Sequence, residues 1–150
     1  MEEEKSSSGF FINFTMSLKI TLKPHERMII GGAVVTNGST RSDLIIENKV
    51  PILRQKDILG EKDANTPCRR IYFVIQLMYI DEQNLRTYHK TYWELVYDLV
   101  KAMPSALDYI DKISAHILNN NYYQALKVAR QLIDYEKEVM DSVSEPSTCV

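Results

Sequence analysis

The first third of the chain follows a two-residue period. Apolar and polar residues alternate from Leu18 to Leu22, the pattern of a half-buried strand, and four more short apolar or β-branched runs follow. The dipeptide Asn37-Gly38 predicts a hairpin whose central residues have positive φ. Short antiparallel strands at such close spacing predict a small curled sheet or barrel. The expected strands are 18–22, 27–30, 33–36, 43–47 and 50–54.

From Thr66 onward the apolar positions change to a helical period. Thr66 and Pro67 have the residue types of a helix N-cap and a first helical position. Further apolar stripes begin near Asn84, after Pro104 and after the turn at 119–121. The order of elements predicts the α+β class: an N-terminal five-stranded antiparallel barrel or curled sheet, followed by a C-terminal four-helix region.

These patterns divide the chain into four parts. Residues 1–15 are acidic, then serine-rich, then aromatic, and we expect a disordered or non-native arm with Met16 as the natural start. Residues 16–58 form a β-rich module that resembles an RNA-binding domain. Residues 59–143 form the helical region, and residues 144–150 are expected to be a flexible tail.

Composition excludes several protein classes. Hydrophobic residues make up 45% and charged residues 25%, which is ordinary globular usage. No apolar run approaches the roughly 20 residues of a membrane span, and the acidic start does not resemble a signal peptide. We therefore expect a cytoplasmic protein with no membrane contact.

Candidate chemistry is sparse. Cys68 and Cys149 form no C-x-x-C pair, and no phosphate-loop, dinucleotide-binding or hydrolase motif occurs. The histidines lack a metal-ligand spacing with one another or with cysteine. We expect no metal, no cofactor, no catalytic residue and no enzymatic activity. The three histidines are His25, His89 and His116.

Positive charge gathers in the β-rich module. Residues 17–58 carry seven Lys and Arg against four Asp and Glu, an excess of +3, whereas residues 59–150 carry ten against thirteen, an excess of −3. Cations on strand faces and edges bind nucleic-acid phosphates, or they keep the strands soluble, and both interpretations stay open. The candidate RNA-binding residues are Lys19, Lys23, Arg27, Arg41, Lys49, Arg54 and Lys56.

Two smaller features lie in the helical region. Arg69 and Arg70 fall in the first turn of a helix, where the helix dipole disfavours cations, so we expect local acid pairing or an anionic partner there. Trp93 and Tyr97 share a face beside the main apolar stripe of their helix. That face is either a second buried surface or a patch for binding a protein partner.

Three segments resemble the FlbT family of flagellum-biosynthesis regulators: "LKITLKPHERMIIGGAVVTNG", "IENKVPILRQKDIL" and "TPCRRIYFVIQLMYID". The resemblance implies a post-transcriptional regulator of flagellin synthesis. Such a protein would bind the 5′ untranslated region of flagellin mRNA and affect its stability or translation, as a repressor in some lineages and an activator in others. It also implies a flagellin-binding companion of the FlaF family. The expected partners are thus the flagellin mRNA leader and a FlaF-like protein or flagellin.

Residues 18–58 also resemble the carbon storage regulator (CsrA) family, a five-stranded barrel that forms an intertwined dimer and binds mRNA leaders. Lys23 and Arg54 match the RNA-contacting positions of that family, whereas Leu22 replaces an arginine and Pro24 follows Lys23. The added helices would replace the dimer partner or build a different homo-oligomer. The alternative function is a protein adaptor in flagellum assembly, which docks a FlaF-like partner through its helical half and affects mRNA indirectly.

Overall fold

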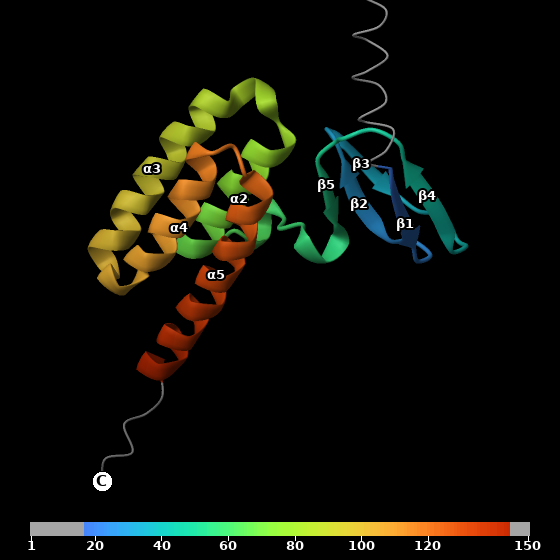
Figure 1. Cartoon of the computed structure of the whole chain (residues 1–150). Coiled ribbons are helices and arrows are strands. Elements are labelled where there is room, and N and C mark those ends of the chain that lie inside the picture. Colours follow the sequence, from blue (N-terminus) through green and yellow to red (C-terminus); the bar gives the residue numbers. More distant parts are fainter. Residues whose placement is uncertain (1–16, 145–150) are drawn as a thin grey trace, which may run out of the picture. The chain divides into compact units, whose positions relative to one another are not determined.

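The computed structural model describes residues 17–144, which form two compact units (Figure 1). The β unit ends at Ile58 and the helical unit begins at Leu59. The expected N-terminal arm, 1–15, and most of the expected tail, 144–150, lie outside the described residues. Ser144 is the last residue of the final helix. The predicted α+β class is confirmed, with strands first and helices after them.

The β unit contains all five predicted strands, with small shifts at their ends. They form two antiparallel sheets, one of β1 and β4 and the other in the order β3-β2-β5. Within residues 17–58 the two sheets do not close into the single barrel that was one of the sequence-based expectations. The strands are β1 (Leu18–Leu22), β2 (Arg27–Ile30), β3 (Ala33–Thr36), β4 (Ser42–Ile46) and β5 (Ile52–Arg54).

A small apolar core joins the two sheets of the β unit. Ile20 and Leu22 of β1 and Met28 of β2 are buried at its centre. Leu22 is only 1% exposed, so the position that departs from the arginine of the carbon storage regulators serves the core instead. Side chains at the rim of this core are partly buried: Ile30, Val35, Leu44, Ile46 and Ile52.

Two turns of the β unit differ in how the chain makes them, and the hairpin predicted at Asn37-Gly38 is wrong. Gly31 has a φ of +60° between β2 and β3, the left-handed conformation that glycine adopts without steric cost. Asn37-Gly38 does not form a hairpin, because β3 and β4 belong to different sheets. Instead the Asn37 side-chain amide donates to the backbone carbonyls of Leu22, Lys23 and Thr40 at 2.8–3.2 Å. These bonds fix the connection between the sheets, a role that the hairpin pattern does not reveal.

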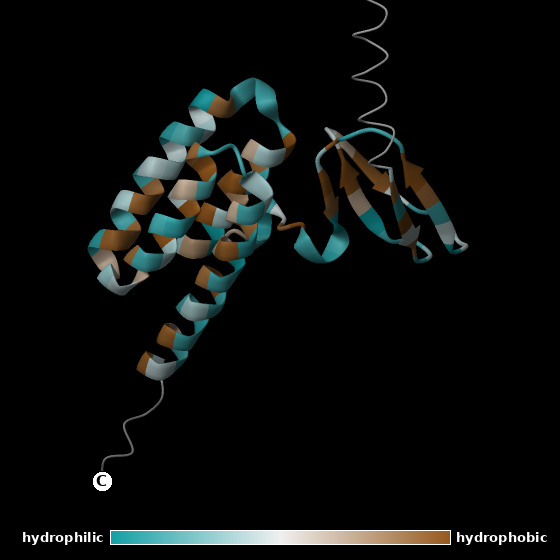
Figure 2. Ribbon diagram, in the orientation of Figure 1, coloured by the Kyte–Doolittle hydropathy of each residue, from teal (hydrophilic) through white to brown (hydrophobic). Residues whose placement is uncertain are grey.

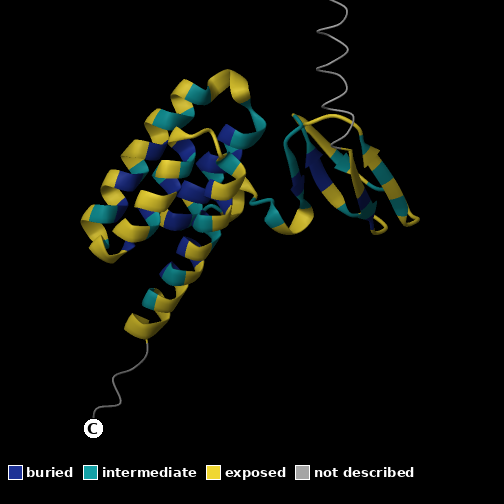
Figure 3. Cartoon of the chain, in the orientation of Figure 1, coloured by how far each residue is buried: buried dark blue, intermediate teal, exposed yellow. Residues whose placement is uncertain are grey.

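The helical unit is built from four α-helices, with short 3₁₀ turns between α2, α3 and α4 and a plain turn at 119–121 before α5. The last helix, α5, packs against both α2 and α4, and α2 also packs against α3. All four helices contribute buried apolar residues, and most of their exposed positions are polar (Figures 2 and 3). None of the described helices is both long and apolar enough to cross a membrane. The helices are α2 (Pro67–Ile80), α3 (Leu85–Ala102), α4 (Leu107–Leu118) and α5 (Tyr122–Ser144).

Two buried polar side chains fasten the start of the helical unit. Gln76 exchanges hydrogen bonds with both backbone groups of Leu59. The carboxylate of Glu136 accepts from the Thr66 hydroxyl at 2.6 Å and from the Cys68 backbone N–H at 3.1 Å. Thr66 is the N-cap of α2, as predicted, since its hydroxyl oxygen accepts from a backbone N–H in the first turn. Burial, together with the nearby Glu136 carboxylate, raises the pKa of the Cys68 thiol, so this cysteine acts as a packing residue.

Candidate nucleic-acid interface

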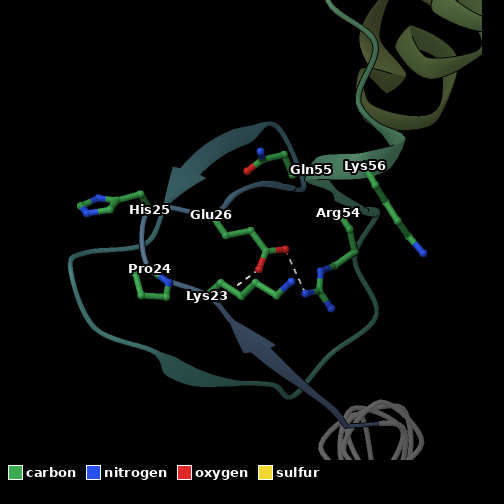
Figure 4. A pocket seen from close by; sticks show the side chains of 7 residues that line it. All are labelled: Lys23, Pro24, His25, Glu26, Arg54, Gln55 and Lys56. Atoms are coloured by element: carbon green, nitrogen blue, oxygen red, sulfur yellow. Dashed lines mark hydrogen bonds and ion pairs between the residues drawn. The ribbon is translucent and has the colours of Figure 1, made fainter.

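A hollow of about 660 Å³ lies in the β unit, where the β1–β2 turn meets the end of β5 (Figure 4). Three of the seven predicted RNA-binding residues line it, and they come from chain positions about thirty residues apart. The residues that line the hollow are Lys23, Pro24, His25, Glu26, Arg54, Gln55 and Lys56.

The turn between β1 and β2 sets one wall of the hollow. The Glu26 N–H donates to the Lys23 carbonyl at 3.1 Å, which closes a four-residue turn with Pro24 at its second position. His25 takes the third position with a φ of +61°, where a side chain is strained. Its N–H donates to the carbonyl of Gly38 at 2.9 Å, and this contact helps to hold the strained residue in place. The turn therefore presents Lys23 and Glu26 toward β5.

Glu26 and Arg54 form an ion pair inside the hollow. Arg54 Nη2 lies 3.0 Å from Glu26 Oε2 and also donates to the Thr21 carbonyl at 3.0 Å. The other carboxylate oxygen of Glu26 accepts from the Lys23 N–H at 2.9 Å. These bonds, first that from the Lys23 N–H and then that from Arg54, hold the pKa of the Glu26 carboxyl below its usual value. Glu26 is thus an anion at neutral pH, next to the cation that was predicted to bind RNA.

The lining has a net positive charge. Lys23, Arg54 and Lys56 contribute three cations against the single carboxylate of Glu26. Gln55 uses its carbonyl oxygen to accept from the Arg27 N–H at 2.7 Å, which ties the residue after β5 to the start of β2. A hollow with clustered cations and exposed polar groups can bind an anion such as a phosphate group.

The other four predicted RNA-binding residues are exposed but do not line the hollow. Lys19 lies on the outer face of β1, where its ammonium is 3.5 Å from a carboxylate oxygen of Asp43 on the paired strand β4. The remaining three are Arg27, Arg41 and Lys49. The structure thus brings together Lys23, Arg54 and Lys56 and leaves the rest spread over the β unit.

The predicted residues of the helical unit lie on its surface. Arg69 donates to the side chain of Asn65 at 3.0 Å, so its local partner is an amide and not the nearby acids. Arg70 is exposed. Trp93 and Tyr97 are 45% and 68% exposed, so this face is not a surface buried within the helical unit. They leave the partner-binding interpretation open.

The described part of the chain offers no metal site. No three His, Cys, Asp or Glu side chains between residues 17 and 144 lie close enough together to hold an ion. His25 lines the hollow, and His89 contacts the Tyr122 hydroxyl at 3.3 Å through a ring nitrogen. The histidines therefore lie at separate places in the fold.

Sequence reasoning missed Glu26 and Gln55, the acidic and the uncharged partner of the basic residues. Glu26 is three residues after Lys23 and follows Pro24, so a bond back to the Lys23 N–H could have been inferred from the turn pattern. Its pairing with Arg54, 28 residues away, has no signal in a single sequence.

Comparison with known proteins places the chain in a family. The family model described as "Flagellar protein FlbT" matches residues 18–140, which span both units. No solved structure matches the chain.

Curated relatives are similar in sequence to this chain over most of their length. A protein of Bradyrhizobium diazoefficiens, described as a probable flagellum biosynthesis repressor of the FlbT type, is 49% identical over 83% of this chain and 85% of its own. A protein of Rhodopseudomonas palustris with the same description is 42% identical over 83% of this chain and 98% of its own. The "Flagellum biosynthesis repressor protein FlbT" of Caulobacter vibrioides is 37% identical over 86% and 93%. The resemblance noted in the sequence is confirmed, and this chain belongs to the FlbT family of flagellar proteins.

Proposed function

We propose that this protein is a post-transcriptional regulator of flagellin synthesis whose β unit binds the 5′ untranslated region of a flagellin mRNA. The names of the relatives, flagellum biosynthesis repressors, support a regulatory role in flagellar synthesis. The observation that carries the RNA-binding part is the convergence of Lys23, Arg54 and Lys56 on one hollow of the β unit.

The size and charge of the hollow favour single-stranded RNA. Pockets of roughly 300–1,000 Å³ take ligands the size of a nucleotide, and the hollow, at about 660 Å³, lies in that range. Cations that track a phosphate backbone give affinity without reading the bases. Binding does not require a closed barrel, because Lys23 directly follows β1 and Arg54 ends β5 in the two-sheet arrangement. The protein would act by changing leader structure or access for other factors, without bond-making chemistry of its own.

A charge-reversal experiment tests this function. The probe is flagellin leader RNA, the fluorescein-labelled 5′ leader transcript of a flagellin gene from the organism that encodes the chain. We expect Lys23→Glu/Lys56→Glu to weaken binding at least about tenfold at low salt. The slope of log affinity against log salt should also become shallower, by about 0.7 for each phosphate that the variant no longer neutralises. Fluorescence anisotropy at several salt concentrations measures both.

The matched control reverses two cations of the same unit outside the hollow. Arg41→Glu/Lys49→Glu makes the same change in net charge at exposed positions. It should alter affinity much less than the hollow variant does. Equal losses for the two variants, or no binding by the wild type at low salt, would refute an RNA site at this hollow.

The exposed aromatic pair supports a second candidate function, that of an adaptor for a protein partner. Trp93 and Tyr97 lie one turn apart on α3, and Lys101 lies over the Tyr97 ring at 6.0 Å. Exposed Trp and Tyr are enriched at the centres of protein interfaces. In this function the helical unit docks a FlaF-like protein or flagellin, and the effect on mRNA is indirect.

Copurification with a FlaF-like protein and with flagellin tests the adaptor function. Trp93→Ala/Tyr97→Ala should remove most of the partner from the eluate. Tyr123→Ala on α5 is the control, since Tyr123 is also an exposed aromatic, at 40%. Retention of the partner by the Trp93/Tyr97 variant, or an equal loss with the control, would rule out this patch.

A further inference from the structure

The ion pair in the hollow holds Arg54 by only one edge. Both of its assigned hydrogen bonds, to Glu26 and to the Thr21 carbonyl, use the same nitrogen, Nη2. A guanidinium that meets a carboxylate or phosphate in the forked, two-bond geometry binds it more strongly and more specifically. The Glu26–Arg54 contact therefore leaves part of the donor capacity of Arg54 unused.

A second observation points the same way. The Nε–H of Arg54 is buried and has no hydrogen-bond acceptor among the described residues. A buried donor without an acceptor destabilises the state that contains it. The Arg54 side chain as a whole remains 38% exposed and lines the hollow, so an external anion can reach its guanidinium. An acceptor that bonds both Nη2 and Nε can therefore compete with Glu26 for Arg54.

Glu26 is held in place by a contact that does not involve Arg54. Its Oε1 accepts from the Lys23 N–H, and its side chain is only 15% exposed. Figure 4 shows its carboxylate between the Lys23 and Arg54 side chains, on the side of the turn opposite the His25 ring. The carboxylate, held by the turn, therefore competes with an external anion for the Arg54 guanidinium.

We propose that the hollow is a phosphate-binding site blocked by its own carboxylate, and that an entering phosphate group displaces Glu26 from Arg54. Where that phosphate belongs to RNA, the proposal rests on the function proposed above; the shared chemistry is a phosphate oxyanion. Lys23 attracts the anion, Arg54 turns to it with two donors, and the cost of breaking the internal pair lowers the affinity. The pair thus sets a threshold that only a ligand with several contacts exceeds.

The test removes the charge of Glu26 and keeps its shape. Glu26→Gln retains an oxygen that can accept from the Lys23 N–H but no longer neutralises Arg54. We expect about a three- to tenfold gain in affinity for flagellin leader RNA at low salt, and a salt slope steeper by about 0.7, as one more phosphate is neutralised. Most of the gain should vanish in an Arg54→Gln background, where the cation that pairs with Glu26 is gone and only Lys23 remains beside it.

Asp43→Asn is the matched control. It makes the same change in net charge in the same unit and also frees a cation, Lys19, but Asp43 does not line the hollow. An equal gain with Asp43→Asn, or a gain with Glu26→Gln that persists undiminished in the Arg54→Gln background, would overturn the proposal, because it would reduce the effect to net charge. Thermal unfolding of each variant confirms that the compared proteins are folded.

Inorganic phosphate is the second probe. It distinguishes the proposed phosphate site from the proposed RNA-binding function. The Arg54 Nε–H resonance, followed by NMR during a phosphate titration, should shift at lower phosphate concentration in Glu26→Gln than in wild type or Asp43→Asn. If phosphate behaves in this way but RNA does not bind, the blocked site stands and the RNA function fails. If RNA binds the wild type and Glu26→Gln resembles Asp43→Asn with both probes, only the blocked site fails.

Discussion

The β unit and the helical unit are stabilised in different ways. Five apolar side chains of the β unit are buried, against eighteen in the helical unit. In the β unit, hydrogen bonds from polar side chains to the backbone also fix the chain. The Asn37 side chain donates to three carbonyls, and the side chains of Gln55 and Glu26 accept from the N–H groups of Arg27 and Lys23.

This difference bears on how variants of each unit are interpreted. In the helical unit the apolar core fixes the fold, and surface residues such as Tyr97, 68% exposed, can be replaced with little structural cost. In the β unit the residues beside the hollow also hold the strands together. A change in RNA binding on mutation of Arg54 or Glu26 is therefore informative only when stability is measured as well.

The largest effect should come from truncating the apolar core of the helical unit. Ile75 of α2 is fully buried, so Ile75→Ala should lower the free energy of unfolding by about 2–5 kcal/mol through reduced burial and the cavity left behind. Urea unfolding followed by the fluorescence of Trp93, the only tryptophan, measures it. Leu118→Ala, at a side chain 72% exposed at the end of α4, serves as the control in the same unit. A cost below about 1 kcal/mol for Ile75→Ala would contradict the contrast between the units.

The buried carboxylate of the helical unit tests whether that unit also depends on a polar contact. Glu136→Ala leaves the Thr66 hydroxyl and the Cys68 N–H without their acceptor. The expected loss is about 2–3 kcal/mol of unfolding free energy. Glu138→Ala, two residues along at an exposed position, should change little. If both variants unfold at the same urea concentration, the contact from α5 does not stabilise the start of α2.

The elements were predictable where local chemistry decides them. Alternation placed β1, and the Thr66-Pro67 pair placed the start of α2, because strand burial and N-capping depend on neighbouring residues. Three of the seven basic candidates meet at the hollow, yet the sequence could not single them out. Their convergence depends on β5 pairing with β2, a contact between residues far apart in the chain.

The wrong prediction of a hairpin at Asn37-Gly38 has the same cause, a pairing between distant strands. The local pattern favours a hairpin, but β4 pairs with β1, so the chain leaves β3 without turning back on it. Glu26 and Glu136 were missed because each acts on a residue 28 or more positions away. In this protein, a single sequence does not predict which distant residue a polar side chain will contact.

Asn37→Ala should have an intermediate effect, confined to the β unit. It removes three bonds to backbone carbonyls in a partly exposed connection, with an expected cost of about 1–2 kcal/mol because water replaces some of them. Amide hydrogen exchange of β2, measured by NMR, detects it where Trp93 fluorescence does not. Asn48→Ala, at an exposed asparagine, is the control. Unchanged protection of β2 would show that the apolar core alone holds the two sheets together.

The smallest effect concerns Asp81, the acid that joins α2 to α3. Its carboxylate accepts from the Tyr88 hydroxyl at 2.6 Å and from the Asn84 amide at 2.9 Å. These bonds, led by that from Tyr88, lower the pKa of Asp81. Because the pKa is lower in the folded state, Asp81 stabilises the fold at pH values above the ordinary aspartate pKa, and this contribution disappears as pH falls through the lowered value.

Asp81→Asn should therefore flatten the acid side of the stability curve of the helical unit and leave the β unit unchanged. In the β unit, Glu26 and Asp43 also have lowered pKa values and keep their own acid dependence. Urea unfolding followed by Trp93 fluorescence between pH 7 and about pH 3 reports on the helical unit, and amide exchange of β2 reports on the other. Tyr88→Phe, which removes the leading hydrogen bond, should reproduce part of the flattening. If Asp81→Asn keeps the full acid dependence of the Trp93 signal, then the Tyr88–Asp81 contact does not couple the helical unit to pH, and the acid response belongs to other carboxylates.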